Sequence, residues 1–189
     1  VKNKKLHLIH PFDDPFVIAG AGTIGLELIE DSNRDLECVL VPLSGGGMLA
    51  GIATAVKTIA PNIRIIGVSM EKGASMFHSI KRGKPINVKE MDTIADALGG
   101  NIGSKNQWTF ETVQDLVDDI VLVKDEMIKK AMCVLFHSLG FMIEGAGAVG
   151  IAALMSGAVS PRGTAACILS GRNIGSEQFL KILNKQGTT

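Results

Sequence analysis

Three glycine-bearing loops contain the residue types that could bind a small ligand. They are Ser44–Gly47, Ala97–Asn101 and Ser170–Asn173. The first is the most informative, because it lies between an apolar run expected to be a strand and a segment expected to be a helix. Backbone N–H groups without covering side chains would converge there on the positive end of the helix dipole. The loop therefore predicts a phosphate site, and a tight turn that needs glycine only for packing is the alternative.

Two further stretches match the G-x-G-x-x-G pattern of dinucleotide-binding proteins. Gly20–Gly25 would follow a short strand at Phe16–Ala19, and Gly145–Gly150 is expected to make a close helix contact instead. The acidic candidates Asp35 and Glu37 lie only roughly 10–15 residues beyond the first stretch, where about 20 are expected. A nucleotide-binding P-loop is excluded, because no Gly-Lys-Ser/Thr follows the glycines. A dinucleotide site at Gly20–Gly25 remains the alternative to the phosphate site at Ser44–Gly47.

The elements that must position these loops alternate between strands and helices. The expected strands are 16–19, 37–41, 63–68, 120–123 and 165–169, and the expected helices are 23–31, 48–59, 72–82, 110–116, 126–139, 146–156 and 176–183. Asp125 is expected to cap the helix that follows it. The strands are continuous apolar runs, which is typical of strands buried on both faces. The pattern predicts a three-layer α/β/α fold with a mainly parallel sheet.

Composition and charge exclude several classes of protein. The 189 residues are 46% hydrophobic and carry 19 basic and 19 acidic side chains. This balance excludes a disordered chain and argues against charge-driven binding to nucleic acid or membranes. Cys38, Cys133 and Cys167 are too scattered for a disulfide framework and indicate buried thiols, as in the cytoplasm. The longest apolar stretch, Gly145–Val159, is too short to span a bilayer.

Several motifs resemble those of one enzyme family. Its stretches, in chain order, are His10–Pro15, Val41–Gly51, Thr93–Ala97, Asp115–Asp119, Ile143–Gly145 and Leu169–Asn173. Together they resemble the threonine dehydratase and serine racemase group of pyridoxal-phosphate enzymes, which have the tryptophan-synthase-β-like fold (fold type II). The resemblance covers nearly the whole chain. Details in residues 67–70, 97–100 and 170–173 look closest to the hydroxyectoine-utilisation dehydratase branch.

The resemblance implies a role for each matching residue. The backbone N–H groups of Ser44, Gly45, Gly46, Gly47 and Met48 would hold the cofactor phosphate. Phe12 and Ala97 would line the cofactor ring, Glu144 would lie near the cofactor, and Ser170 would contact the pyridine nitrogen. A helix N-cap is the alternative role for Ser170. A neutral hydroxyl at that nitrogen makes the ring a weaker electron sink, which suits β-elimination.

The implied reaction is the dehydration of a hydroxy amino acid to a keto acid and ammonia. The substrate would be threonine-like, serine-like or derived from hydroxyectoine. No divalent metal is expected, because Ser69 stands where serine racemase has a metal-binding Glu. The alternative is a non-catalytic or dinucleotide-binding α/β module.

Two motifs of the family do not occur in the sequence. They are S-F-K-x-R-G, which carries the Schiff-base lysine, and S-x-G-N-H, which binds the substrate carboxylate. No catalytic residue is therefore assigned in this chain. We expect the C-terminal part of a longer enzyme, with residues 1–20 at the edge of a small domain and 21–189 in the large domain. Such a part would be inactive without the missing N-terminal segment, and the whole enzyme is expected to be a homodimer.

Overall fold

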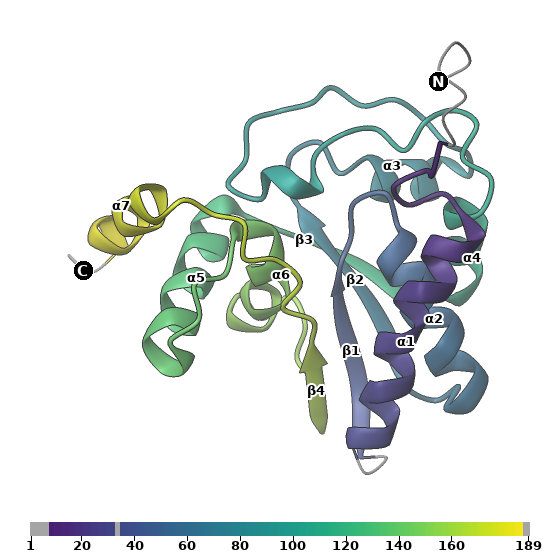
Figure 1. Ribbon diagram of the computed structural model, residues 1–189, viewed down its shortest axis with the longest axis horizontal. Helices are drawn as coiled ribbons and strands as arrows, with labels where there is room; N and C mark the ends of the chain where they lie inside the picture. The colour runs from purple at the N-terminus through teal and green to yellow at the C-terminus, as the bar shows by residue number, and fades with distance from the viewer. Residues whose placement is uncertain (1–7, 33–34, 187–189) are drawn as a thin grey trace.

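The computed structural model describes residues 8–32 and 35–186. Within these ranges, four strands form one sheet: β1 (Leu36–Pro42), β2 (Arg64–Met70), β3 (Asp119–Val123) and β4 (Thr164–Cys167). Their order across the sheet is β3-β2-β1-β4, and every neighbouring pair is parallel (Figure 1). The chain therefore moves from β1 outward to β3 and then returns to the opposite side of β1.

Helices cover both faces of this sheet (Figure 1). One set comprises α1 (Pro15–Asp31), α2 (Gly47–Ile59), α3 (Ser75–Arg82) and α4 (Thr109–Leu116), and the other comprises α5 (Asp125–Leu139), α6 (Gly145–Met155) and α7 (Ser176–Gln186). Val39 and Val41 of β1 pack into the core with α2, whereas Leu40 packs into the core with α5 and α6. Because β1 carries apolar side chains on both faces, both faces must be buried against helices. The predicted three-layer α/β/α fold is confirmed.

The first helix corrects the prediction of a strand at Phe16–Ala19. These residues form the start of α1, which is continuous from Pro15 to Asp31. Asp14 caps the helix, since its carboxylate accepts hydrogen bonds from the N–H groups of Phe16 at 2.8 Å and Val17 at 3.2 Å. An Asp cap followed by Pro at the first helical position is a strong helix start. The domain boundary expected after residue 20 falls inside this helix.

The glycines of Gly20–Gly25 serve helix packing, so the dinucleotide interpretation of this stretch is wrong. The whole stretch lies within α1, and no strand-to-helix turn is present there. A Cβ added to Gly22 would lie 3.3 Å from the carbonyl oxygen of Gly51, and one added to Gly25 would lie 3.0 Å from that of Ile52. Glycine therefore lets α1 pack closely on α2.

The second glycine-rich stretch makes the close contact that the sequence predicted. Gly145–Gly150 begins α6, and a Cβ on Gly145 would collide with the backbone of Ile94. A Cβ on Gly150 would lie 3.4 Å from the Sγ of Cys167 on β4. The small residues thus let α6 lie directly on the sheet.

Asp125 does not cap the helix that follows it. It is the first residue of α5, whose N-cap is Lys124. The Oδ1 of Asp125 accepts a hydrogen bond of 2.6 Å from the hydroxyl of Thr93. The carboxylate therefore anchors the loop before η2 (Asp96–Leu98), a short 3-10 helix, instead of serving its own helix.

Lys57 and Asp118 form an ion pair between the end of α2 and the start of β3. The Nζ of Lys57 lies 2.7 Å from the Oδ2 of Asp118 and also donates to the carbonyl of Ile63. The same carboxylate accepts the N–H of Ile65 at 2.6 Å. Burial alone would raise the pKa of Asp118, but the hydrogen bonds from Lys57 and Ile65 hold it below its ordinary value. This pair joins the amino ends of β2 and β3.

Membrane-spanning helices and cysteine pairing are both features on which the sequence makes a prediction. In residues 8–32 and 35–186, no helix has both the length and the apolar character that crossing a membrane requires. All three cysteines lie in the described ranges as free thiols, with Cys38 buried and the other two half-buried.

Candidate functional site

The strand order creates a crevice at the carboxyl end of β1. β2 lies on one side of β1 and β4 on the other, so the chain connections diverge at this point. In open parallel sheets, ligands bind at such a switch point. The N–H of Ile168 donates to the carbonyl of Leu40 at 3.0 Å, which extends the pairing of β4 with β1. The loops that follow the two strands therefore leave the sheet side by side.

The loop after β1 presents a row of unpaired backbone N–H groups. Gly46 has a φ of 92° as the N-cap of α2, a left-handed conformation that favours glycine. Gly45, Gly46 and Gly47 are buried. Within the described residues, the N–H groups of residues 44–48 donate to no protein acceptor. Unpaired amides at a helix N-terminus form an anion site, and their number and arrangement fit a phosphate ester.

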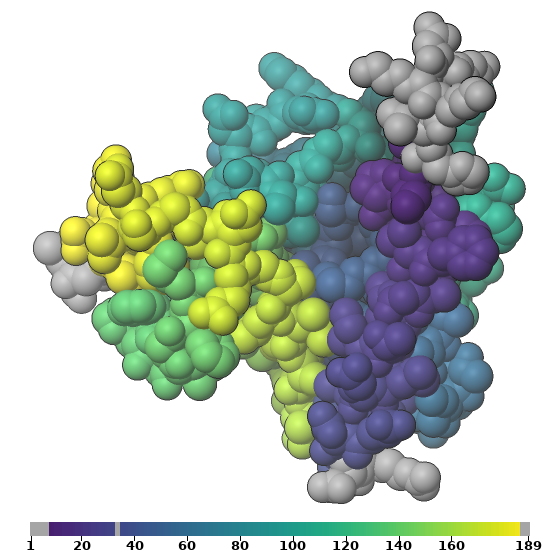
Figure 2. All heavy atoms as spheres, in the orientation of Figure 1, coloured from purple at the N-terminus to yellow at the C-terminus, as the bar shows by residue number. Residues whose placement is uncertain are grey.

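All nine residues that the sequence singled out line one pocket. The pocket has a volume of about 260 Å³. Its lining is Pro11, Phe12, Pro42, Ser44, Gly45, Gly46, Gly47, Met48, Ala97, Leu98, Glu144, Ala146 and Ser170. Figure 2 shows a hollow in this face between the purple N-terminal segment, the teal loop and the yellow-green segment after β4. We call this cavity the glycine-loop pocket.

Four lining residues of the glycine-loop pocket were missed by the sequence analysis. Pro11 and Leu98 each adjoin a predicted residue in the sequence, Ala146 follows Glu144 by two residues, and Pro42 ends β1 two residues before Ser44. All four are apolar. Their position near predicted binding residues in the sequence is a signal that could have found them. Their apolar residue types give no such signal.

Ser170 offers a free hydroxyl to the pocket. The side chain is exposed, and no hydrogen bond to its hydroxyl occurs among the described residues. The next helix, α7, begins only at Ser176, so the alternative role of Ser170 as a helix N-cap is wrong. The hydroxyl can therefore donate to or accept from a ligand atom in the pocket.

Glu144 packs against the loop that carries Ser170. Its backbone N–H donates to the carbonyl of Gly171 at 3.1 Å. A Cβ on Gly171 would collide with the carboxylate of Glu144, so only glycine leaves room for that side chain. The arrangement ties the start of α6 to the Ser170 loop.

Phe12 packs directly against the glycine loop. A Cβ on Gly45 would collide with the Phe12 ring, and one on Gly47 would lie 2.9 Å from the Phe12 Cα. The next residue, Asp13, accepts hydrogen bonds from the N–H groups at the start of α4. Burial alone would raise the pKa of Asp13, but the hydrogen bonds from Thr109, Gln107 and Trp108 and the nearby His10 lower it.

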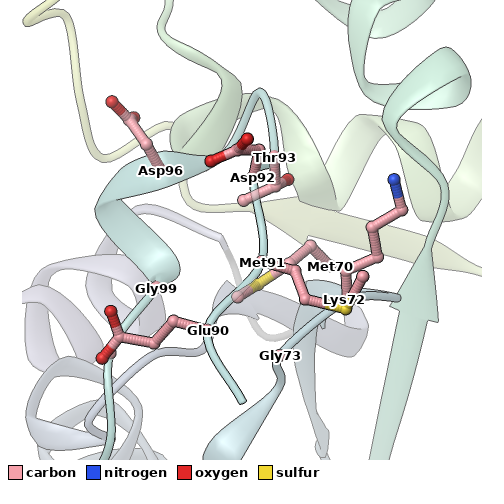
Figure 3. Close-up of a pocket in the computed structure, with 10 residues that line it drawn as sticks. Met70, Lys72, Gly73, Glu90, Met91, Asp92, Thr93, Asp96 and Gly99 are labelled. Carbon is pink, nitrogen blue, oxygen red and sulfur yellow. The ribbon is translucent and has the colours of Figure 1, made fainter.

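A larger cavity of about 460 Å³ lies on the other side of η2. Asp96 and Gly99 line that cavity, whereas Ala97 and Leu98 line the glycine-loop pocket. Figure 3 shows Lys72 and Glu90 pointing to opposite sides of it, so its charged groups do not converge on one point. Among the described residues, no group of three or more His, Cys, Asp or Glu could hold a metal ion.

The comparisons with known proteins define the family. The sequence profile described as "Pyridoxal-phosphate dependent enzyme" matches residues 1–171. The chain belongs to this family, whose members use pyridoxal phosphate, and the predicted cofactor class is confirmed.

The relatives include the enzymes that the motifs resemble. An L-threonine ammonia-lyase from Geobacter sulfurreducens is 44% identical over 167 residues, covering 88% of this chain and 41% of that protein. The processed form of threonine deaminase isoform 2 from Solanum lycopersicum superposes with a TM-score of 0.89 at 35% identity, covering 98% of this chain and 54% of that one. Maize serine racemase gives a TM-score of 0.86 at 32% identity, covering 98% and 57%. The resemblance to this group, with its fold type II, is confirmed.

The chain spans about half the length of the curated relatives that it matches. No lysine lines the glycine-loop pocket among the described residues.

Proposed function

We propose that this chain is the cofactor-holding part of a pyridoxal-phosphate lyase that dehydrates a threonine- or serine-like amino acid. The products would be a keto acid and ammonia. One observation carries the proposal: unpaired backbone N–H groups of residues 44–48 and the free hydroxyl of Ser170 line the same pocket. This is the pair of contacts that a phosphate ester joined to a pyridine ring requires.

The residues of this chain would bind the cofactor at two ends. The amides of residues 44–48 hold the phosphate at the positive end of the α2 dipole. Pyridoxal phosphate, when bound, supplies an electron-withdrawing ring that stabilises charge developing at the substrate Cα. Phe12, Ala97 and Glu144 also line this pocket and would contact the ring.

Ser170 would favour elimination over reactions that store charge on the ring. Its neutral hydroxyl can hydrogen-bond the pyridine nitrogen but does not hold a proton there as a carboxylate would. The electron pair released at the substrate Cα would then form a Cα=Cβ double bond, while the Cβ–O pair leaves with the hydroxyl group, more readily than charge would accumulate on the ring. The loss of water from a β-hydroxy amino acid fits this preference.

The lysine that links the cofactor would come from a segment outside this chain. None of the described lysines lines the pocket, and Lys57 is held by Asp118 and the carbonyl of Ile63 at the other end of the sheet. In this proposal residues 21–189 belong to the large domain, and the whole enzyme forms a homodimer. The chain alone is inactive. A hydroxyectoine-derived amino acid is the finer substrate proposal, and it rests on the motif details at residues 67–70, 97–100 and 170–173.

Borohydride trapping tests this proposal. Pyridoxal phosphate is added to the isolated chain and to the full-length gene product, each is reduced with borohydride, and the peptides are analysed by mass spectrometry. We expect a reduced pyridoxyl-lysine only in the full-length product, outside the residues of this chain. The full-length product should also release ammonia from threonine or serine. A reduced pyridoxyl-lysine anywhere within this chain would overturn the assignment of the lysine, and a full-length product that binds no cofactor would overturn the function.

A further inference from the structure

The carboxylate of Asp13 caps a helix that lies almost a hundred residues further along the chain. Its Oδ2 accepts the N–H of Gln107 at 2.8 Å. Its Oδ1 accepts the N–H groups of Trp108 at 2.7 Å and Thr109 at 2.9 Å. Hydrogen bonds to an ionised carboxylate are about twice as strong as neutral ones. One side chain thus satisfies three N–H groups at the start of α4.

The capped end of α4 also contacts the glycine loop. A Cβ on Gly46 would lie 3.2 Å from the Cβ of Thr109, and Thr109 is fully buried. On the other side, Phe12 leaves no room for a side chain on Gly45 or Gly47. The glycine loop is therefore held between Phe12 and the start of α4, and Asp13 joins these two neighbours.

A local hydrogen bond fixes the direction of this segment. The N–H of Asp13 donates to the Nδ1 of His10 at 2.8 Å. The turn from His10 to Asp13 places the Phe12 ring edge-on to the His10 ring, with their centroids 4.6 Å apart. Rotation of Phe12 away from the loop would therefore have to disturb both the turn and the cap.

We propose that Asp13 is a positioning residue for the phosphate-binding amides of residues 44–48. It ties the Phe12 segment to α4 and so fixes both walls of the glycine loop. This inference rests on the proposed cofactor function of the loop. It adds that the affinity for pyridoxal phosphate depends on a carboxylate that does not itself line the pocket.

Asp14 provides a matched control. It is half-buried like Asp13, and it also caps a helix, since it accepts the N–H groups of Phe16 and Val17. That helix is its own, α1, and the cap makes no link to α4. Replacing Asp14 therefore removes a cap of the same chemistry without releasing the walls of the glycine loop.

The first experiment measures cofactor affinity. Wild type, Asp13→Ala and Asp14→Ala are prepared both as this chain and as the full-length product, and pyridoxal phosphate binding is followed by absorbance and by the emission of Trp108, the single tryptophan of this chain. Loss of a cap costs roughly tenfold in an equilibrium constant, so both variants should melt at a lower temperature. Only Asp13→Ala should bind the cofactor more weakly, by about tenfold. Equal affinity in Asp13→Ala and wild type would overturn the inference while leaving the proposed function intact.

The second experiment needs no cofactor. Hydrogen exchange is measured at the backbone amides of Gln107, Trp108 and Thr109 in the same variants. We expect exchange at least about tenfold faster in Asp13→Ala and unchanged in Asp14→Ala. Unchanged protection in Asp13→Ala would show that the cap does not hold α4, and the inference would fail. If wild type in full-length form binds no pyridoxal phosphate, the proposed function fails and the role of Asp13 in affinity fails with it.

Discussion

The N–H of Ile168 donates to the carbonyl of Leu40, and this hydrogen bond brings the two ends of the glycine-loop pocket together. Ser170 follows Ile168 by two residues, and Ser44 follows Leu40 by four. Parallel strands place their carboxyl ends at the same edge of the sheet, so both loops open there. The pocket thus depends on pairing between segments that lie more than a hundred residues apart.

Replacing Ser170 with alanine should weaken cofactor binding without destabilising the fold. The side chain is exposed, so the melting temperature should not change. Loss of one neutral hydrogen bond should reduce the affinity of the full-length product for pyridoxal phosphate by about two- to tenfold. Ser160→Ala, at another exposed serine, is the control and should bind as wild type does. Equal affinity in the two variants would remove Ser170 from the site.

Alanine substitutions at two glycines of the Gly20–Gly25 stretch should change the free energy of unfolding in opposite directions. Gly20 has no atom within 4 Å of an added Cβ, whereas a Cβ on Gly25 would lie 3.0 Å from the carbonyl oxygen of Ile52 and from the Cβ of Ala55. Both lie within α1. Gly20→Ala should raise the free energy of unfolding by about 0.5–1 kcal/mol, since alanine favours helix. Gly25→Ala should lower it by about 1–3 kcal/mol through overpacking. Urea unfolding measures both, and equal effects would contradict the packing of α1 on α2.

The three thiols should react slowly in the folded chain. Burial raises the pKa of Cys167 to about 11, and the neighbouring Cys38 adds to the effect. Burial also raises the pKa of Cys38 and Cys133. A free thiol has a pKa of about 8.5, so at about pH 8 labelling of Cys167 should be on the order of 100-fold slower than in urea. Labelling is followed by mass spectrometry, and rapid labelling of Cys167 in the native chain would contradict the raised pKa of its thiol.

Local sequence predicted most of the elements, because continuous apolar runs and helix periods are local. β1 and β2 follow from such runs, and Gly46 was identified from its place between a strand and a helix. The run at Phe16–Ala19 was assigned to a strand because four apolar residues fit either structure. The signal that decides is the pair Asp14 and Pro15, which starts a helix.

The residues that line the site could be predicted from the sequence, but the long-range hydrogen bonds that hold the site in place could not. The nine pocket residues came from motifs that the family shares, since each motif is a short local pattern. Asp13 caps the helix that begins at Thr109, which lies far away in the sequence. No residue spacing within a helix or turn could therefore indicate this cap. The same holds for the hydrogen bond between Asp125 and Thr93, which replaced an expected local cap. Long-range polar contacts depend on the packing of the whole sheet.

The ion pair of Lys57 and Asp118 should make the stability of the fold depend on pH in a defined direction. The folded pKa of Asp118 lies below its ordinary value, because hydrogen bonds from Lys57 and Ile65 outweigh the effect of burial. A carboxylate with a lowered folded pKa stabilises the fold above its unfolded pKa, which is about 3.9, and loses this contribution as the pH falls through the folded pKa. Near neutral pH, Asp118→Asn should cost about 0.5–1 kcal/mol, because it leaves Lys57 without its counter-ion at a site where solvent screens the pair.

Urea unfolding from neutral pH down to about pH 3 measures this dependence. The gap between wild type and Asp118→Asn should narrow as the pH falls, because protonation weakens the same pair in wild type. Asp119→Asn is the matched control: Asp119 is exposed and, within the described residues, accepts only the N–H of the adjacent Ile120, so its replacement should change stability by less than about 0.5 kcal/mol. A gap that stays constant over the whole range would show that the charge of Asp118 contributes nothing. The link between α2 and β3 would then rest on hydrogen bonds that asparagine can also accept.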